Sequence, residues 1–134
     1  MALVDTITGY THVNITVTDL EAAHDFYINK LGFSVLPRPD FPGFGGAWYR
    51  VGNLQIHLVV GEEIPDPKGG MPHIAFHIPK DCFDATIDAL KSGGVDFMGD
   101  TMSREDLGVP VKAAFCRDPS GNVIELTDVG PFDS

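Results

Sequence analysis

The stretch HIAFHI, His73–Ile78, alternates between two kinds of side chain. The apolar positions are Ile74, Phe76 and Ile78, and the positions between them are His73, Ala75 and His77. Because successive side chains of a strand point to opposite faces, this alternation predicts a strand with one buried face. The second face of such a strand needs no histidine, so the presence of two indicates a binding or catalytic role.

The same pattern occurs near the start of the chain. HVNITV, His12–Val17, aligns with HIAFHI when His12 is placed over His73, and both strands run into a segment with helical spacing of apolar residues. Two strands of one pattern, each followed by a helix, predict an internal repeat and therefore two similar half-structures.

A second pair of segments supports the repeat. GNLQIHL, which begins at Gly52, aligns with GNVIEL, which begins at Gly121, when one residue is inserted. This alignment places His57 over Glu125. Since the two pairs of segments align in the same order along the chain, chance similarity of short apolar strands is the weaker explanation.

Each half is expected to follow the order strand, helix and three strands. The expected helices are 20–31 and 80–92, and the expected strands are 10–18, 33–36, 47–51, 54–60, 72–78, 95–98, 111–117 and 122–129, with 99–110 as a long loop. The sequence thus predicts an α+β fold of two βαβββ modules. They form one domain over residues 1–134, with module one at about 8–62 and module two at about 71–129.

The composition narrows the class of protein. The 134 residues suffice for one domain, and the net charge of -10 without a basic stripe makes nucleic acid an unfavourable partner. No apolar run approaches the length of a membrane helix and no secretory signal is recognisable, so we expect a cytoplasmic protein. Cys82 and Cys116 form no Cys-x-x-Cys pattern, which excludes a thiolate zinc cluster, and we expect both thiols to be reduced and buried.

Four residues combine these features, and they are His12, His57, His73 and Glu125. Each lies on the polar side of an alternating strand, and each has an equivalent in the other half. Folding the two halves together is expected to gather all four on one face of a curved sheet. Imidazole and carboxylate groups suit Zn, Fe, Mn, Ni or Co, and open positions at such a site indicate catalysis.

A single histidine on a strand more often has a structural role, as a hydrogen-bonded residue that lines a surface. The internal repeat instead favours metal binding for the four residues together. A triad of His12, His73 and Glu125 suffices for some metals. His57 is therefore either a fourth ligand or a second group that supports the ligands or carries a proton.

Further residues are candidates for a substrate pocket, and they are His77, Asn14, Arg38, Phe44 and Trp48. Same-face neighbours on a strand are roughly 6–7 Å apart, so His77 does not easily share an ion with His73 and is expected in the pocket wall. Core or dimer packing is an equal alternative for the aromatic residues. Arg38, Arg50 and Arg104 are candidates for an anionic substrate group, with a solvated surface charge as the alternative, and His24 is expected at the surface.

Several longer stretches carry a family resemblance, namely THVNITVTDLEAAHDFYINKLGF, YRVGNLQIHL, MPHIAFHI and FCRDPSGNVIEL. The chain resembles the vicinal oxygen chelate superfamily, which includes glyoxalases, bleomycin-resistance proteins and extradiol dioxygenases. The resemblance implies paired βαβββ modules that form a curved mixed sheet, a cup around one divalent metal. By position, His12, His73 and Glu125 match ligands of the family, while His57 stands where glyoxalase I enzymes commonly carry glutamate.

The function implied by this resemblance is that of a metal-dependent, glyoxalase-like lyase or isomerase acting on a small vicinal-oxygen substrate. The metal would polarise a carbonyl group and acidify an adjacent C–H bond. Glu125 is the first candidate for the proton carrier and His57 the second. The resemblance also implies an oligomeric state. Glyoxalase I enzymes of similar length act as dimers whose sites are shared between chains, so we expect a homodimer.

Three alternatives remain from the sequence. A fosfomycin-resistance-like thiol transferase fits the length and ligands, but ELTDVGPFDS lacks the arginine that those enzymes carry after the carboxylate ligand. An extradiol-type dioxygenase fits two histidines and a glutamate at iron, but a fourth ligand would crowd the positions that dioxygen needs. A metal-free, bleomycin-resistance-like binding protein suits an acidic chain, but such proteins usually lack the ligand set.

Overall fold

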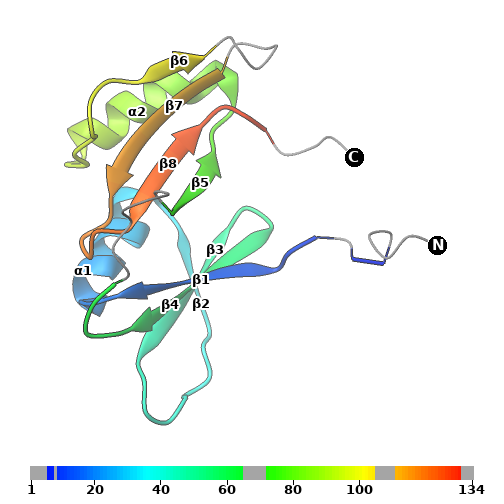
Figure 1. Cartoon of the computed structure of the whole chain (residues 1–134), viewed down its shortest axis with the longest axis vertical. Helices are drawn as coiled ribbons and strands as arrows, with labels where there is room; N and C mark the ends of the chain where they lie inside the picture. Colours follow the sequence, from blue (N-terminus) through cyan, green and yellow to red (C-terminus); the bar gives the residue numbers. More distant parts are fainter. Residues whose placement is uncertain (1–5, 8, 65–71, 105–110, 131–134) are drawn as a thin grey trace.

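The structure is a computed structural model that describes residues 6–7, 9–64, 72–104 and 111–130. It holds two four-stranded mixed sheets, one above the other in the view of Figure 1. The first sheet has the order β1-β4-β3-β2, from β1 (His12–Val17), β4 (Leu54–Val60), β3 (Gly46–Val51) and β2 (Ser34–Leu36). The second has the order β5-β8-β7-β6, from β5 (His73–His77), β8 (Val123–Thr127), β7 (Val111–Arg117) and β6 (Met102–Arg104).

The two sheets share one topology. In each, the first strand runs parallel to the last strand of its half, and the other neighbours are antiparallel. This order agrees with the internal repeat and confirms the α+β class with paired βαβββ modules. The first strand of each half, β1 or β5, stands at the end of its sheet, and its outer edge pairs with no other strand of the described chain.

The first helix begins where the sequence predicts and changes from α-helical to π-helical after its first five residues. Asp19 accepts a hydrogen bond from the backbone N–H of Ala22 at 3.1 Å and so caps α1 (Leu20–His24). A π-helical segment, η2 (Asp25–Lys30), follows without a break, where the sequence predicts one regular helix. In module two a short 3₁₀ turn, η3 (Lys80–Cys82), leads into α2 (Phe83–Ser92).

The second strand of module two lies later in the chain than predicted. Residues 95–98 form only a single bridge, between Phe97 and Cys116, and β6 lies inside the segment expected as a long loop. Val95 explains part of this difference because it is buried and donates its N–H to the carbonyl of Leu90 at the end of α2. Gly99, with φ of +80°, then turns the chain before it pairs with β7.

The two modules are joined by a buried hydrogen-bond network. Tyr27 of η2 is fully buried and donates its hydroxyl to Asp118 of the β7–β8 turn at 2.7 Å. Asn122 of the same turn donates to the carbonyl of Thr16 at 2.8 Å. Burial and the adjacent Asp118 carboxylate raise the pKa of Tyr27 far above its usual value, so the phenol remains a donor. An edge contact between Phe33 and Phe76, with ring centroids 5.1 Å apart, adds apolar packing.

The cysteines differ in their surroundings. Cys116 is fully buried on β7, and burial raises the pKa of its thiol to about 11. Cys82, at the start of α2, is exposed, so the expectation of two buried thiols is wrong for this residue. The reason is that Cys82 ends the 3₁₀ turn η3, whose residues are all exposed. Among the described helices, none has the length and apolar character that crossing a membrane requires.

Candidate functional site

His12 and His57 lie together on one face of the first sheet. The parallel register of β1 and β4 places His57 opposite Asn14, so His12 stands diagonally one pair away on the same face. The two rings stack with centroids 4.0 Å apart and planes inclined by 17°. Two of the four candidate ligands are therefore adjacent within one module.

Hydrogen bonds fix both rings. His12 Nδ1 is 2.7 Å from the Thr11 hydroxyl oxygen, and His57 Nε2 is 2.8 Å from the side-chain oxygen of Gln55. The other ring nitrogens, Nε2 of His12 and Nδ1 of His57, have no hydrogen bond within the described part of the chain. Metal-binding histidines are commonly oriented in this way, through the nitrogen that does not bind the metal.

The electrostatic surroundings favour neutral His57. Burial lowers its pKa from 6.5, and the nearby His12 and Arg38 lower it further. A neutral imidazole is the form that donates its lone pair to a metal ion. The site therefore holds His57 in a metal-competent state around neutral pH.

His73 and Glu125 lie on the corresponding face of the second sheet. Glu125 is in register with Ala75 of β5 and Phe115 of β7, and His73 lies two residues before Ala75 on the same face. The His73 ring meets the edge of Phe115 with centroids 5.8 Å apart. Glu125 is half-buried and lines the cleft between the sheets.

Within one chain, the pair His12 and His57 lies apart from the pair His73 and Glu125. Among the described residues, no three or more His, Cys, Asp or Glu side chains lie close enough to hold one metal ion. The expectation that the halves of one chain gather all four residues on a single face therefore does not hold. The reason is that the modules join through Tyr27, Asp118 and Asn122, which leaves the two sheets separate.

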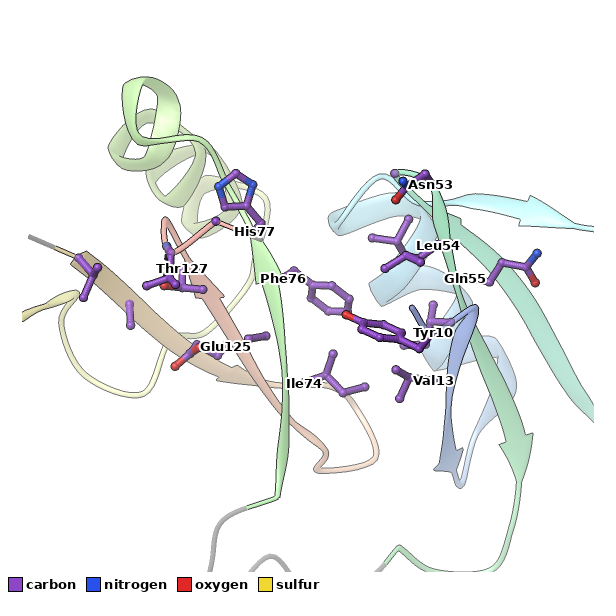
Figure 2. Close-up of a pocket in the computed structure, with 18 residues that line it drawn as sticks. Tyr10, Val13, Asn53, Leu54, Gln55, Ile74, Phe76, His77, Glu125 and Thr127 are labelled. Atoms are coloured by element: carbon purple, nitrogen blue, oxygen red, sulfur yellow. Dashed lines mark hydrogen bonds between the residues drawn. The ribbon is translucent and has the colours of Figure 1, made fainter. Parts of the chain in front are cut away.

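A cleft of about 690 Å³ separates the sheets. Figure 2 shows Ile74 and Phe76 of β5 facing Tyr10 and Val13 across it. His77 lines the same cleft, in keeping with the predicted pocket wall, and its Nε2 lies 3.5 Å from the position that a side chain on Gly130 would occupy. The cleft walls are mainly apolar, and Tyr10 is 66% exposed.

The other predicted pocket residues lie on the first sheet and its β2–β3 loop. Trp48 stacks on His57 with centroids 4.2 Å apart and planes 6° apart, and Asn14 stands in register beside His57. Phe44 stacks on Phe41, with the Arg38 guanidinium over both rings. These residues extend the face that carries His12 rather than the cleft.

Two other arginines were candidates for an anionic group. Arg50 is exposed and donates from Nε to the carbonyl of Gly52 at 2.8 Å, so it has a backbone partner of its own. The side chain of Arg104 lies outside the described part of the structure.

Two arrangements were not predicted from the sequence. His24 is half-buried rather than at the surface, and its Nδ1 lies 2.6 Å from the hydroxyl of Tyr49. Its place one residue after the buried Ala23 was the available signal. The stacking of Arg38 on two phenylalanines was also missed, although RPDFPGF spaces the three residues evenly.

A family model matches residues 9–126 and describes the glyoxalase/bleomycin resistance protein/dioxygenase superfamily. This chain belongs to that superfamily. A solved structure of a glyoxalase family protein from Bacillus anthracis superposes with a TM-score of 0.71 at 27% identity, covering 90% of this chain and 93% of that one. The resemblance found in the sequence is thereby confirmed at the level of family and fold.

Curated relatives carry several different activities in their names. The chain is 33% identical over 130 residues to an ethylmalonyl-CoA/methylmalonyl-CoA epimerase of Cereibacter sphaeroides, covering 88% of this chain and 96% of the relative. It is 31% identical to the metallothiol transferase FosB of Lysinibacillus sphaericus, covering 90% and 82%. It is 28% identical to glyoxylase I 4 of Arabidopsis thaliana, covering 90% and 70%. These relatives are enzymes, which supports an enzymatic role for this chain without identifying the reaction.

Proposed function

We propose that the chain is a divalent-metal-dependent enzyme of the lyase or isomerase kind whose metal site is shared between two protomers. His12 and His57 of one protomer would face His73 and Glu125 of the partner subunit. The observation that carries this proposal is the pair of equivalent half-sets. Each lies on the same face of a sheet of the same topology, and the chain does not unite them.

The residues fit a metal ion chemically. Three imidazoles and one carboxylate form a donor set suited to Zn, Ni, Fe, Mn or Co. His12 and His57 are each held through one nitrogen, and His57 is kept neutral by its surroundings. Such pre-orientation lowers the cost of assembling the ligands.

Within the described part of the chain, the outer edges of β1 and β5 pair with no other strand, which supports assembly into a homodimer. An exposed edge strand is a ready surface for pairing with another chain, and exposed apolar side chains lie on or beside β1. Tyr10 is 66% exposed beside β1, and Val129 is 47% exposed after β8. A twofold axis that brings β1 of one protomer near β5 of the other generates two identical sites, so one operation completes both half-sets.

A bound divalent ion would act as a Lewis acid toward a carbonyl oxygen of the substrate. Within the chain, Glu125 is the proposed proton carrier because it is a half-buried carboxylate on the ligand-bearing face. His57 is the second candidate, and its low pKa leaves the neutral ring able to accept a proton. The aromatic wall formed by Trp48 and Phe41 would exclude water from one side of the substrate.

The proposed substrate is a small molecule with neighbouring oxygens. The names of the relatives include an epimerase, and inverting a carbon next to a carbonyl requires the removal and return of a proton. The same proton transfer underlies the lyase or isomerase reaction proposed here. Both uses need the carboxylate, the imidazole and the Lewis acid in one site.

Metal content tests this proposal. Elemental analysis of protein purified without chelator or metal-affinity tag should give about one divalent ion per chain, since a twofold dimer has two sites. His73→Ala and Glu125→Gln should each remove most of the metal. His24→Gln is the matched control, because His24 binds Tyr49 and lies outside the ligand set. A wild-type chain that takes up no metal from excess Zn, Ni, Co, Fe or Mn would overturn the proposal.

The 31% identity to a metallothiol transferase favours one second candidate, thiol addition at the same metal site. Metal content does not separate the two reactions, but cosubstrate dependence does. Consumption of a small thiol in proportion to product would favour transfer, whereas turnover without loss of free thiol would favour the lyase or isomerase reaction.

A further inference from the structure

We infer that Arg38, seated on Phe41 and Phe44, forms a subsite for an anionic group of the ligand, next to a flat apolar part of the same molecule. The assignment of this subsite to a substrate rests on the proposed function. The binding of the anion itself is independent of any metal.

The guanidinium of Arg38 is held in place by two aromatic rings. Its central carbon lies 4.9 Å from the ring centroid of Phe41 and 5.5 Å from that of Phe44. The two rings are stacked, with centroids 5.3 Å apart and planes 9° apart. A planar cation over aromatic faces is favourable, and it fixes an otherwise mobile side chain before any ligand arrives.

The charge of Arg38 has no counter-charge within the described part of the chain. Its Nε is buried without a hydrogen bond, and no carboxylate of the described residues lies within ion-pair distance. This is unusual in a chain with 19 acidic and 9 basic residues. Because the guanidinium is half-buried over two rings and its charge is unpaired among the described residues, an incoming anion gains more here than at a fully solvated arginine.

Gly46 is required first by the carbonyl oxygen of Leu58, with which a Cβ atom would collide, and its lack of a side chain also leaves room for Arg38. A Cβ atom at residue 46 would lie 3.2 Å from both Nε and Nη2 of Arg38, which is tighter than ordinary packing. The inner part of the guanidinium therefore rests against the backbone of β3. Because Nε itself has no exposed surface, a ligand anion would reach the group through its terminal nitrogens, which can bind two oxygens of one carboxylate or phosphate.

The subsite is continuous with the histidine pair. Phe41 lies beside Trp48, with centroids 6.3 Å apart, and Trp48 stacks on His57, which stacks on His12. Phe41 and Phe44 are 39% and 46% exposed, so this wall is open to a ligand. A ligand with an anion at Arg38 and oxygens at the histidines would lay its flat part on Trp48.

Trp48 provides the measurement, because it is the only tryptophan of the chain. Full-length protein, treated with chelator to remove metal, would be titrated with phenylacetate, phenylphosphonate and neutral phenylacetamide while Trp48 fluorescence is followed. We expect at least one of the two anions to change the emission in a saturable way. Phenylacetamide, which has the same ring without the charge, should bind about tenfold more weakly or not at all. The anion that binds more tightly distinguishes a carboxylate from a phosphoryl ligand.

Arg38→Met should weaken binding of the preferred anion by about tenfold or more. Arg50→Met is the matched control. It also removes one arginine charge, from the adjoining strand β3, but the guanidinium of Arg50 already donates to the carbonyl of Gly52. The affinity of the Arg50→Met variant for the same anion should stay within about twofold of wild type, because salt screens the effect of exposed charges at a distance. Far-ultraviolet circular dichroism of each variant confirms that it is folded.

Three results would overturn the inference. These are no saturable change with either anion, equal binding of phenylacetamide, or equal losses for Arg38→Met and Arg50→Met. The metal proposal is tested separately by metal content. An anion site in a protein that takes up no metal would leave the subsite standing and remove the proposed function.

Discussion

Tyr27 shows how much of this fold rests on one hydroxyl group. The side chain is fully buried between the modules, and its hydroxyl donates to Asp118 at 2.7 Å. Asp118 also accepts from the backbone N–H groups of Ser120 and Asn122. The contact thus links the first helix to the turn between β7 and β8.

Tyr27→Phe should lower the free energy of unfolding by about 1–3 kcal/mol, because the buried carboxylate of Asp118 loses a donor. Chemical denaturation of the variant and of Tyr10→Phe provides the comparison, since Tyr10 is 66% exposed. The control should change by less than about 0.5 kcal/mol. Equal effects in the two variants would show that the hydroxyl of Tyr27 adds no special stability.

Individual side chains were predicted well where a repeat constrained them. The alignment of His12 with His73 and of His57 with Glu125 placed each on a strand, on the face where the structure has it. The stacking of Arg38 was not predicted, because Phe41 and Phe44 lie in an irregular loop. In such a loop no sequence periodicity indicates where a side chain points. His24 escaped because its partner Tyr49 comes from another element.

At the scale of elements, Asp128 ties the end of β8 to the start of β7. Its carboxylate accepts from the backbone N–H of Lys112 at 2.8 Å and pairs with Lys80 at 3.3 Å. Burial alone would raise the pKa of Asp128, but these hydrogen bonds and charges outweigh it and hold the pKa below 3.8. A carboxyl group with a depressed pKa stabilises the fold above its unfolded value, and this contribution disappears as the pH falls through the folded value.

Asp128→Asn should therefore be less stable than wild type near neutral pH, and the difference should shrink as the pH falls below 3.8. Urea unfolding at a series of pH values measures this. Asp84→Asn is the control, since Asp84 is 71% exposed and pairs with the same Lys112, so its loss should matter little. A gap between Asp128→Asn and wild type that stays constant down to the lowest pH would contradict the assignment.

Most strands were predicted from the alternation of apolar and polar residues, but β6 and the π-helical segment η2 were not. Alternation is local, so it predicts β1, β4, β5, β7 and β8 directly. The position of β6 depends on how far the chain travels after the helix cap at Val95 and the turn at Gly99. The π-helical turn of η2 likewise depends on tertiary packing around Phe26 and Tyr27, which no sequence period contains.

At the scale of the whole molecule, the pattern of residues led to the expectation that one chain gathers the four candidate ligands, and the structure keeps them in two pairs. Family, fold class and repeat all followed from residues within one chain. The modules join through Tyr27 and Asn122, and these long-range contacts leave the two pairs of candidate ligands apart. A shared site between protomers is the proposal that unites the pairs without rearranging the chain.

The most direct test is a heterodimer of two deficient chains. One chain carries His12→Ala with His57→Ala, the other carries His73→Ala with Glu125→Gln, and each bears a different affinity tag free of histidine. If sites are shared, the heterodimer purified on both tags has one intact and one doubly damaged site. It should therefore hold about half the metal of wild type, while either homodimer holds almost none. A heterodimer as empty as the homodimers, beside a wild-type protein that binds metal, would contradict the shared site.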